Sequence, residues 1–190
     1  NVQPLFADLS TGGFAVAHNG NISNATALKK ILVRRGSIFQ STSDTEVIIH
    51  LVATSNYRTL LDRFIDALKQ VEGAYSLICL TAEGMIGCRD PLGIRPLVLG
   101  DLDGAWILAS ETCALDIIGA RFVRDLFFDG IDFLLRESSY AIEGDMILEV
   151  ALVDAEPARF AVRPGWPDPV AVLVHHHGRE VVAALVDDVR

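Results

Sequence analysis

Helical and strand-like patterns occupy separate stretches of the first 110 residues, and this segregation restricts the fold more than any other feature. Between residues 23 and 71, apolar side chains recur at helical spacing, as Leu28, Ile31 and Leu32 do. Between residues 74 and 109, short apolar runs alternate with turn formers, which is typical of hairpins. Because helices and strands form separate runs, the sequence favours an α+β fold over an alternating α/β fold.

These patterns set the expected elements. Helices are predicted at residues 23–35, from residue 43 onward, at 57–71 and at 113–118. Strands are predicted at residues 14–17, 75–80, 85–88, 97–100, 105–109 and 122–123. The second helix begins with Ser43, and Glu46 three residues later completes a capping box. Asp44 then falls in the first turn, where the helix dipole alone would explain an acidic side chain.

Asn19 and Gly20 belong to a short polar segment that follows the apolar run at 14–17. An Asn-Gly pair after a strand is typical of a two-residue hairpin turn. The segment that follows, however, reads as a capped helix rather than a returning strand. We therefore expect Asn19 and Gly20 at a strand-to-helix junction, where a carboxamide donor and an unencumbered backbone N–H can point at the same spot.

Length, charge and hydropathy limit the function classes. The 190 residues are 51% hydrophobic, which suits one domain with a core, or one domain with an appendage. The net charge of -9 argues against nucleic acid and anionic membranes as partners. No apolar run reaches the ~18–20 residues of a membrane span, and the first residues do not resemble a signal peptide. We expect a cytoplasmic protein.

Cysteines and histidines indicate no metal site. The three cysteines fit neither a disulfide framework nor a metal-ligand spacing. Cys79 and Cys113 are expected in the core, and Arg89 could lower the pKa of the adjacent Cys88. The His run at 175–177 is interpreted as chance, because no ligand at usable spacing supports it. His18 is expected to have a structural role as a hydrogen-bonded residue, or to orient the Asn19 loop.

Five motifs occur in order along the chain. They are Asn-Val-Gln-Pro at 1–4, His-Asn-Gly-Asn at 18–21, Thr-Ser-Asp-Thr-Glu at 42–46, Arg-Asp-Pro-Leu-Gly-Ile-Arg-Pro-Leu-Val-Leu-Gly at 89–100, and Ala-Ser-Glu-Thr-Cys-Ala-Leu-Asp at 109–116. As a set they resemble the glutaminase domain of the amidophosphoribosyltransferase family, within the class II (N-terminal nucleophile) glutamine amidotransferases. The resemblance covers residues 1–125. Residues 126–190 form a β-rich tail of unclear origin that does not resemble the family.

The resemblance implies a fold and site residues. The fold would be a partial four-layer αββα sandwich of the N-terminal-nucleophile hydrolase type, with two antiparallel sheets between helical layers. Asn19 and Gly20 match the oxyanion-hole pair, whose donors stabilise the charge that develops on the glutamine carboxamide oxygen. Asp44 matches the carboxylate that pairs with the α-ammonium group of glutamine.

Two further residues of the family site are not found. The family uses a cysteine at the mature N-terminus, whose own α-amine serves as base, but residue 1 here is Asn1. The internal cysteines cannot replace it by this mechanism, because their amines are in peptide bonds. The family's arginine for the glutamine α-carboxylate would precede Asn1. Arg34 and Arg35 lie on a predicted helix and are expected to be solvated.

The resemblance also implies a function and partners. The parent enzyme would release ammonia from glutamine for transfer to phosphoribosyl pyrophosphate in a domain absent here, in the first step of purine synthesis. It would be a homo-oligomer. Mg²⁺ and, in some members, an iron–sulfur cluster would bind outside these residues, and no metal or cofactor is expected in this chain. Two alternatives stay open: a non-catalytic remnant or fusion that keeps the fold for binding or assembly, and another class II amidotransferase.

Overall fold

The computed structural model describes residues 3–82 and 84–126, together with the backbone of five strands in the tail. These strands are β8 (Tyr140–Ala141), β9 (Ile147–Leu148), β10 (Ala151–Asp154), β11 (Val170–His176) and β12 (Arg179–Leu185). The side chains of the His run at 175–177 lie outside the described residues, so its interpretation as chance stays a prediction.

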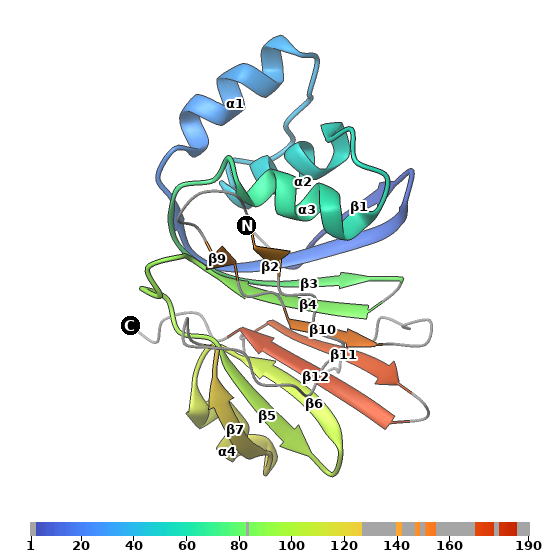
Figure 1. Ribbon diagram of the computed structural model, residues 1–190, viewed down its shortest axis with the longest axis vertical. Helices are drawn as coiled ribbons and strands as arrows, with labels where there is room; N and C mark the ends of the chain where they lie inside the picture. Colours follow the sequence, from blue (N-terminus) through green and yellow to red (C-terminus); the bar gives the residue numbers. More distant parts are fainter. Residues whose placement is uncertain are drawn as a thin grey trace.

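Two five-stranded sheets face each other in the centre of the molecule (Figure 1). Their strands from residues 3–126 are β1 (Leu5–Leu9), β2 (Gly12–Ile22), β3 (Gly73–Thr81), β4 (Gly84–Arg89), β5 (Val98–Leu102), β6 (Ala105–Ala109) and β7 (Arg121–Asp125). The first sheet has the order β1-β2-β3-β4-β10, and the second has the order β11-β12-β6-β5-β7. Both predicted hairpins, β3 with β4 and β5 with β6, are present.

Helices cover the outer faces of both sheets (Figure 1). They are α1 (Ala25–Arg34), α2 (Thr45–Thr54), α3 (Leu60–Leu68) and α4 (Thr112–Ile118). The first three lie over the first sheet and α4 lies against the second, which gives four layers. The predicted α+β class and αββα layering are confirmed. The third helix is shorter than the predicted 57–71, because Thr59 caps it by accepting a hydrogen bond from the Asp62 N–H at 3.1 Å.

Alternating side chains along the strands build the three apolar layers between these four. On β2, Phe14 and Val16 face the helices, and Phe14 packs against Phe64 of α3 with ring centroids 6.1 Å apart. Ala15 and Ala17 point the other way, into the layer between the two sheets. A strand with both faces buried has no polar face, which explains the unbroken apolar run at 14–17.

The predicted junction at Asn19 and Gly20 is wrong in one respect. The strand does not end at Ala17: β2 runs on to Ile22, and Asn19 and Gly20 pair with Ser76 and Tyr75 of β3. The turn and helix follow only after this longer strand. The polar residues do not interrupt the strand, because cross-strand pairing with β3 outweighs the local turn preference of Asn-Gly.

Strands of the tail join both sheets. β10 pairs antiparallel with β4, and β12 pairs in parallel with β6, which is an exception to the expected antiparallel pattern. The division of the chain at residue 125 and the unclear origin of residues 126–190 stay predictions. None of the helices in the described part of the chain has the length and apolar character that crossing a membrane requires.

Candidate active site

Gly20 pairs with Tyr75 of β3 and leaves no room for a side chain. Its φ of +122° belongs to the region that favours glycine. A Cβ built at this position would lie 2.1 Å from the carbonyl oxygen of Ala74 and 3.0 Å from Cα of Tyr75. Since both are backbone atoms of β3, no side-chain movement could make room. The position therefore requires glycine on both conformational and steric grounds.

Asn19, next to it, is a buried polar residue with only 4% of its surface exposed. Strand alternation places it on the face that carries Ala15 and Ala17, at the end of the layer between the sheets. Its cross-strand neighbour is Ser76, which is fully buried. A buried carboxamide has little water around it, and in such a setting a donor acts on a developing charge more strongly than it does in water.

Asp44 is brought to the same end of β2. One carboxylate oxygen, Oδ2, accepts a hydrogen bond of 2.9 Å from the backbone N–H of Ile22, two residues after Gly20. The other oxygen, Oδ1, lies 3.6 Å from Nδ1 of His18. Burial tends to raise the pKa of Asp44, but His18 and the Ile22 N–H outweigh it, so the pKa is lowered. With 27% of its side chain exposed, this carboxylate remains open to a ligand.

His18 connects the two parts of the site. Its imidazole is buried, and Nδ1 lies 3.0 Å from Oγ1 of Thr45 at the start of α2. Its backbone is held by Gln3, whose side chain accepts from the His18 N–H at 2.5 Å and donates to the His18 carbonyl at 2.9 Å. Sequence reasoning assigned no role to Gln3. The only available signal was its place in the first motif.

The predicted capping box is wrong. Asp44, not Ser43, occupies the N-cap position of α2, and its side chain makes no capping bond. The Glu46 carboxylate instead accepts three hydrogen bonds from the preceding loop: from Gln40 N–H at 2.7 Å, Ser41 N–H at 2.8 Å and the Ser41 hydroxyl at 2.7 Å. Glu46 therefore holds the loop that leads into Asp44.

No cysteine of this chain is suited to attack a substrate at this site. Cys79 and Cys88 are buried in β3 and β4, and burial raises the pKa of both thiols. The expected lowering of the Cys88 pKa by Arg89 is therefore wrong: the Arg89 guanidinium donates to the carbonyls of Leu126 and Gly93. Cys113 is exposed on α4, contrary to the prediction of a core position.

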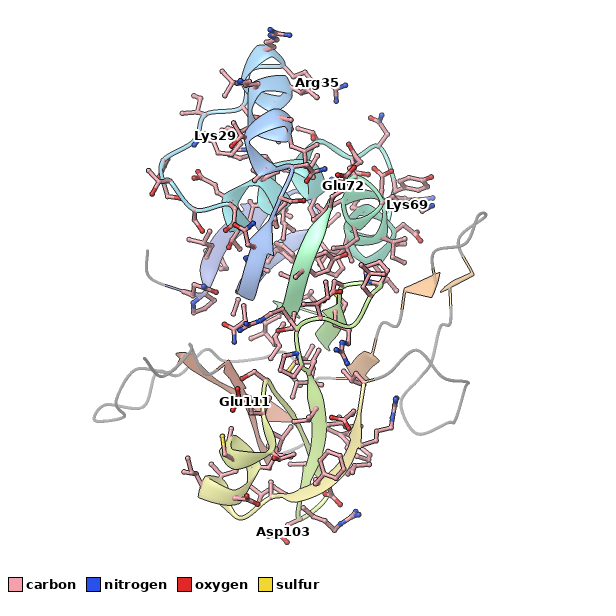
Figure 2. The ribbon with its side chains drawn as sticks, turned by 90° about the vertical axis from the view of Figure 1, so that its left-hand side faces the viewer. Lys29, Arg35, Lys69, Glu72, Asp103 and Glu111 are labelled. Atoms are coloured by element: carbon pink, nitrogen blue, oxygen red, sulfur yellow. The ribbon has the colours of Figure 1, made fainter. Side chains whose placement is uncertain are left out.

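Side chains of the kinds that bind metal ions also occur in the described part of the chain. Within the described residues, no three His, Cys, Asp or Glu side chains converge as metal ligands. With two cysteines buried in strands and the third on α4, these residues fit neither an iron–sulfur cluster nor Mg²⁺. Arg34 and Arg35 are exposed as predicted, and Figure 2 shows Arg35 at the outer end of α1, pointing away from the body.

The four-layer fold is that of the N-terminal-nucleophile hydrolase type. Residues 1–116 match the family model described as "Glutamine amidotransferase domain". That match spans more than half of the chain, so the chain belongs to this family. The resemblance drawn from the five sequence motifs is confirmed.

Curated relatives agree with this assignment. An amidophosphoribosyltransferase of Rhizobium etli is 58% identical over 126 residues, which are 66% of this chain and 25% of the relative. The enzyme of that name from Bacillus subtilis is 47% identical over 127 residues, which are 66% of this chain and 27% of the relative. The chain thus spans about a quarter of the length of these relatives.

Two solved structures share the fold. One is described as the structure of the allosteric regulatory enzyme of purine biosynthesis: it is 47% identical, with a TM-score of 0.64, over 66% of this chain and 27% of that chain. The other is glutamine phosphoribosylpyrophosphate amidotransferase from Bacillus subtilis, in complex with ADP and GMP. It is 39% identical, with a TM-score of 0.65, over 84% of this chain and 33% of that chain.

Proposed function

We propose that the end of β2 binds glutamine, with Asn19 and Gly20 as the oxyanion hole and Asp44 as the partner of the α-ammonium group. One observation carries this proposal: the Asp44 carboxylate is bonded to Ile22, two residues beyond Gly20. Two residues of a strand span about 7 Å. An extended glutamine side chain can reach from a carboxamide held at Asn19 and Gly20 to an ammonium group at Asp44.

The chemistry follows from these positions. A thiolate attacks the carboxamide carbon of glutamine, and negative charge develops on the carboxamide oxygen. The Asn19 side-chain amide and the Gly20 N–H stabilise that charge, and loss of one such donor typically raises the barrier by about 3 kcal/mol. The low pKa of Asp44 keeps its carboxylate ionised, so that it attracts the ammonium group at neutral pH. The thiol comes from a cysteine other than the three in this chain.

We further propose that the whole protein is an amidophosphoribosyltransferase, in which the released ammonia is transferred to phosphoribosyl pyrophosphate in the first step of purine synthesis. The names of the relatives support this proposal. We infer a homo-oligomer located in the cytoplasm, and three free cysteines agree with that location. Mg²⁺ and any iron–sulfur cluster would be bound by residues outside those described.

A chimera tests the catalytic part of the proposal. Residues 1–126 of this chain would replace the matching segment of the Rhizobium etli relative, and ammonia release from glutamine would be measured. Asn19→Ala should lower kcat about 10²- to 10³-fold with little change in KM. Asp44→Asn should instead raise KM about 10- to 100-fold, because a charge-assisted contact is lost. Asn21→Ala, an exposed position on the same strand, should change neither.

Binding of L-glutamine to this chain alone, measured by calorimetry, complements the chimera. The proposal predicts saturable binding that Asp44→Asn weakens. Binding without hydrolysis in a folded chimera would favour the alternative of a non-catalytic remnant. Absence of binding, together with an inactive but folded chimera, would contradict the glutamine site itself.

A further inference from the structure

Gln3 replaces a backbone partner in the first sheet. β1 and β2 pair antiparallel from Leu9 opposite Gly12 to Leu5 opposite Val16. The same register places Gln3 opposite His18, beyond the last backbone pair. There the carboxamide of Gln3 makes both bonds that a strand residue would make: Oε1 accepts from the His18 N–H at 2.5 Å, and Nε2 donates to the His18 carbonyl at 2.9 Å.

These two bonds act on the residue next to the oxyanion-hole pair. The carbonyl of His18 and the N–H of Asn19 belong to one planar peptide unit, so the bond to that carbonyl also orients the Asn19 backbone. On its other edge, β2 is held at Asn19 and Gly20 by pairing with β3. On the β1 edge, the Gln3 side chain holds His18 through the two bonds described above.

We propose that Gln3 is a positioning residue of the glutamine site, which fixes the strand end that carries Asn19 and Gly20. The same two bonds hold the backbone of His18, whose imidazole lies 3.6 Å from Asp44. One side chain thus acts on both ends of the site. The inference rests on the proposed glutamine site, but the two bonds themselves can be tested without glutamine.

A substitution at this position offers a test by pH. In Gln3→Glu, the neutral carboxylic acid has one donor and one acceptor, as the carboxamide does. The ionised carboxylate keeps only acceptors and places a negative charge beside the His18 carbonyl. Gln3→Glu should therefore move towards wild type at pH 4, where about two thirds of a carboxyl group with the ordinary Glu pKa of about 4.3 is protonated. At pH 7 it should behave like Gln3→Ala. Because every other residue of the site is the same in all three proteins, the ratio to wild type at each pH isolates the effect of residue 3.

Two readouts on this chain separate positioning from general stability. Amide hydrogen exchange at His18 reports the bond that its N–H donates to Gln3, and calorimetry reports the affinity for L-glutamine. At pH 7, both Gln3→Ala and Gln3→Glu should speed exchange at His18 and weaken glutamine binding about 3- to 10-fold. At pH 4, Gln3→Glu should move back towards wild type in both properties.

Asn24 supplies a matched control, because its carboxamide also bridges two backbone groups away from the site. It donates to the Gln70 carbonyl at 2.8 Å and accepts from the Glu72 N–H at 3.1 Å. Asn24→Ala and Asn24→Asp should shift the urea midpoint as much as the Gln3 variants do, yet leave glutamine affinity unchanged.

The outcomes distinguish this inference from the proposed function. If wild type binds glutamine and Gln3→Ala binds it equally well, or if Gln3→Glu shows no recovery at pH 4, Gln3 is not a positioning residue. If Asn24→Ala weakens binding as much as Gln3→Ala, the effect is one of stability and the inference is overturned. If wild type binds no glutamine at any pH and the folded chimera is inactive, the proposed function fails, and the positioning role fails with it.

Discussion

A methyl group at position 20 would collide with the backbone of β3, and Gly20→Ala therefore probes the strand end directly. Two costs add. A non-glycine residue at a φ of +122° is strained by about 1–3 kcal/mol. The contact of 2.1 Å with the Ala74 carbonyl oxygen must also be relieved by separating β2 from β3, and overpacking of this kind costs about 1–3 kcal/mol. The expected loss is thus about 2–6 kcal/mol.

Such a loss is large against the total stability of about 5–15 kcal/mol of a typical domain. Urea unfolding followed by circular dichroism measures it. With a slope near 2 kcal/mol per molar urea, the midpoint should fall by about 1–3 M.

Gly36→Ala separates the two costs. Gly36 also has a positive φ, of +98°, but no atom lies within 4 Å of a Cβ built there. This variant should therefore show the conformational cost alone. If Gly20→Ala is no more destabilising than Gly36→Ala, the close approach of β2 and β3 does not constrain position 20, and the steric reasoning is refuted.

Two further predictions concern thiols and carboxylates. In native buffer a disulfide reagent should react rapidly with Cys113. Cys79 and Cys88 should react only on unfolding, because both thiols are buried and have raised pKa values. A second thiol that reacts rapidly would contradict the fold around β3 and β4. For Asp44 and Glu46, hydrogen bonds outweigh the effect of burial and lower the pKa of both side chains. Both ionised carboxylates therefore stabilise the fold above pH about 4, and this contribution is lost as the pH falls further. The urea midpoint should drop below pH 4, and the double variant Asp44→Asn with Glu46→Gln should flatten this drop; an unchanged slope would show that other groups cause it.

The local elements were largely predictable. The helices and both hairpins follow from spacing along the chain, because burial of one face imposes a period of 3.6 or 2 residues on the sequence. The ends of the helices and strands were less predictable. The Asn-Gly pair resembled the end of a strand, yet β2 continues through it. The reason is its pairing with Ser76 and Tyr75, which lie more than 50 residues further along the chain.

The sequence named three candidate site residues but not the contacts that hold them. Asn19, Gly20 and Asp44 were chosen from motifs, and the structure brings all three to one end of β2. Their roles in binding glutamine stay predictions. The partners of Glu46 were missed, because a carboxylate three residues after Ser43 fits a capping box equally well on local spacing.

The sequence by itself determined the class of fold and the family, because both are encoded in residue types and short spacings. Only the tertiary structure decided that Gln3 holds His18 across 15 positions and that His18 meets Thr45 across 27. It also decided that Cys113 is exposed. Contacts between residues so far apart in the sequence depend on strand register and on how helices pack over a sheet. Neither is set by the sequence immediately around the residues in contact.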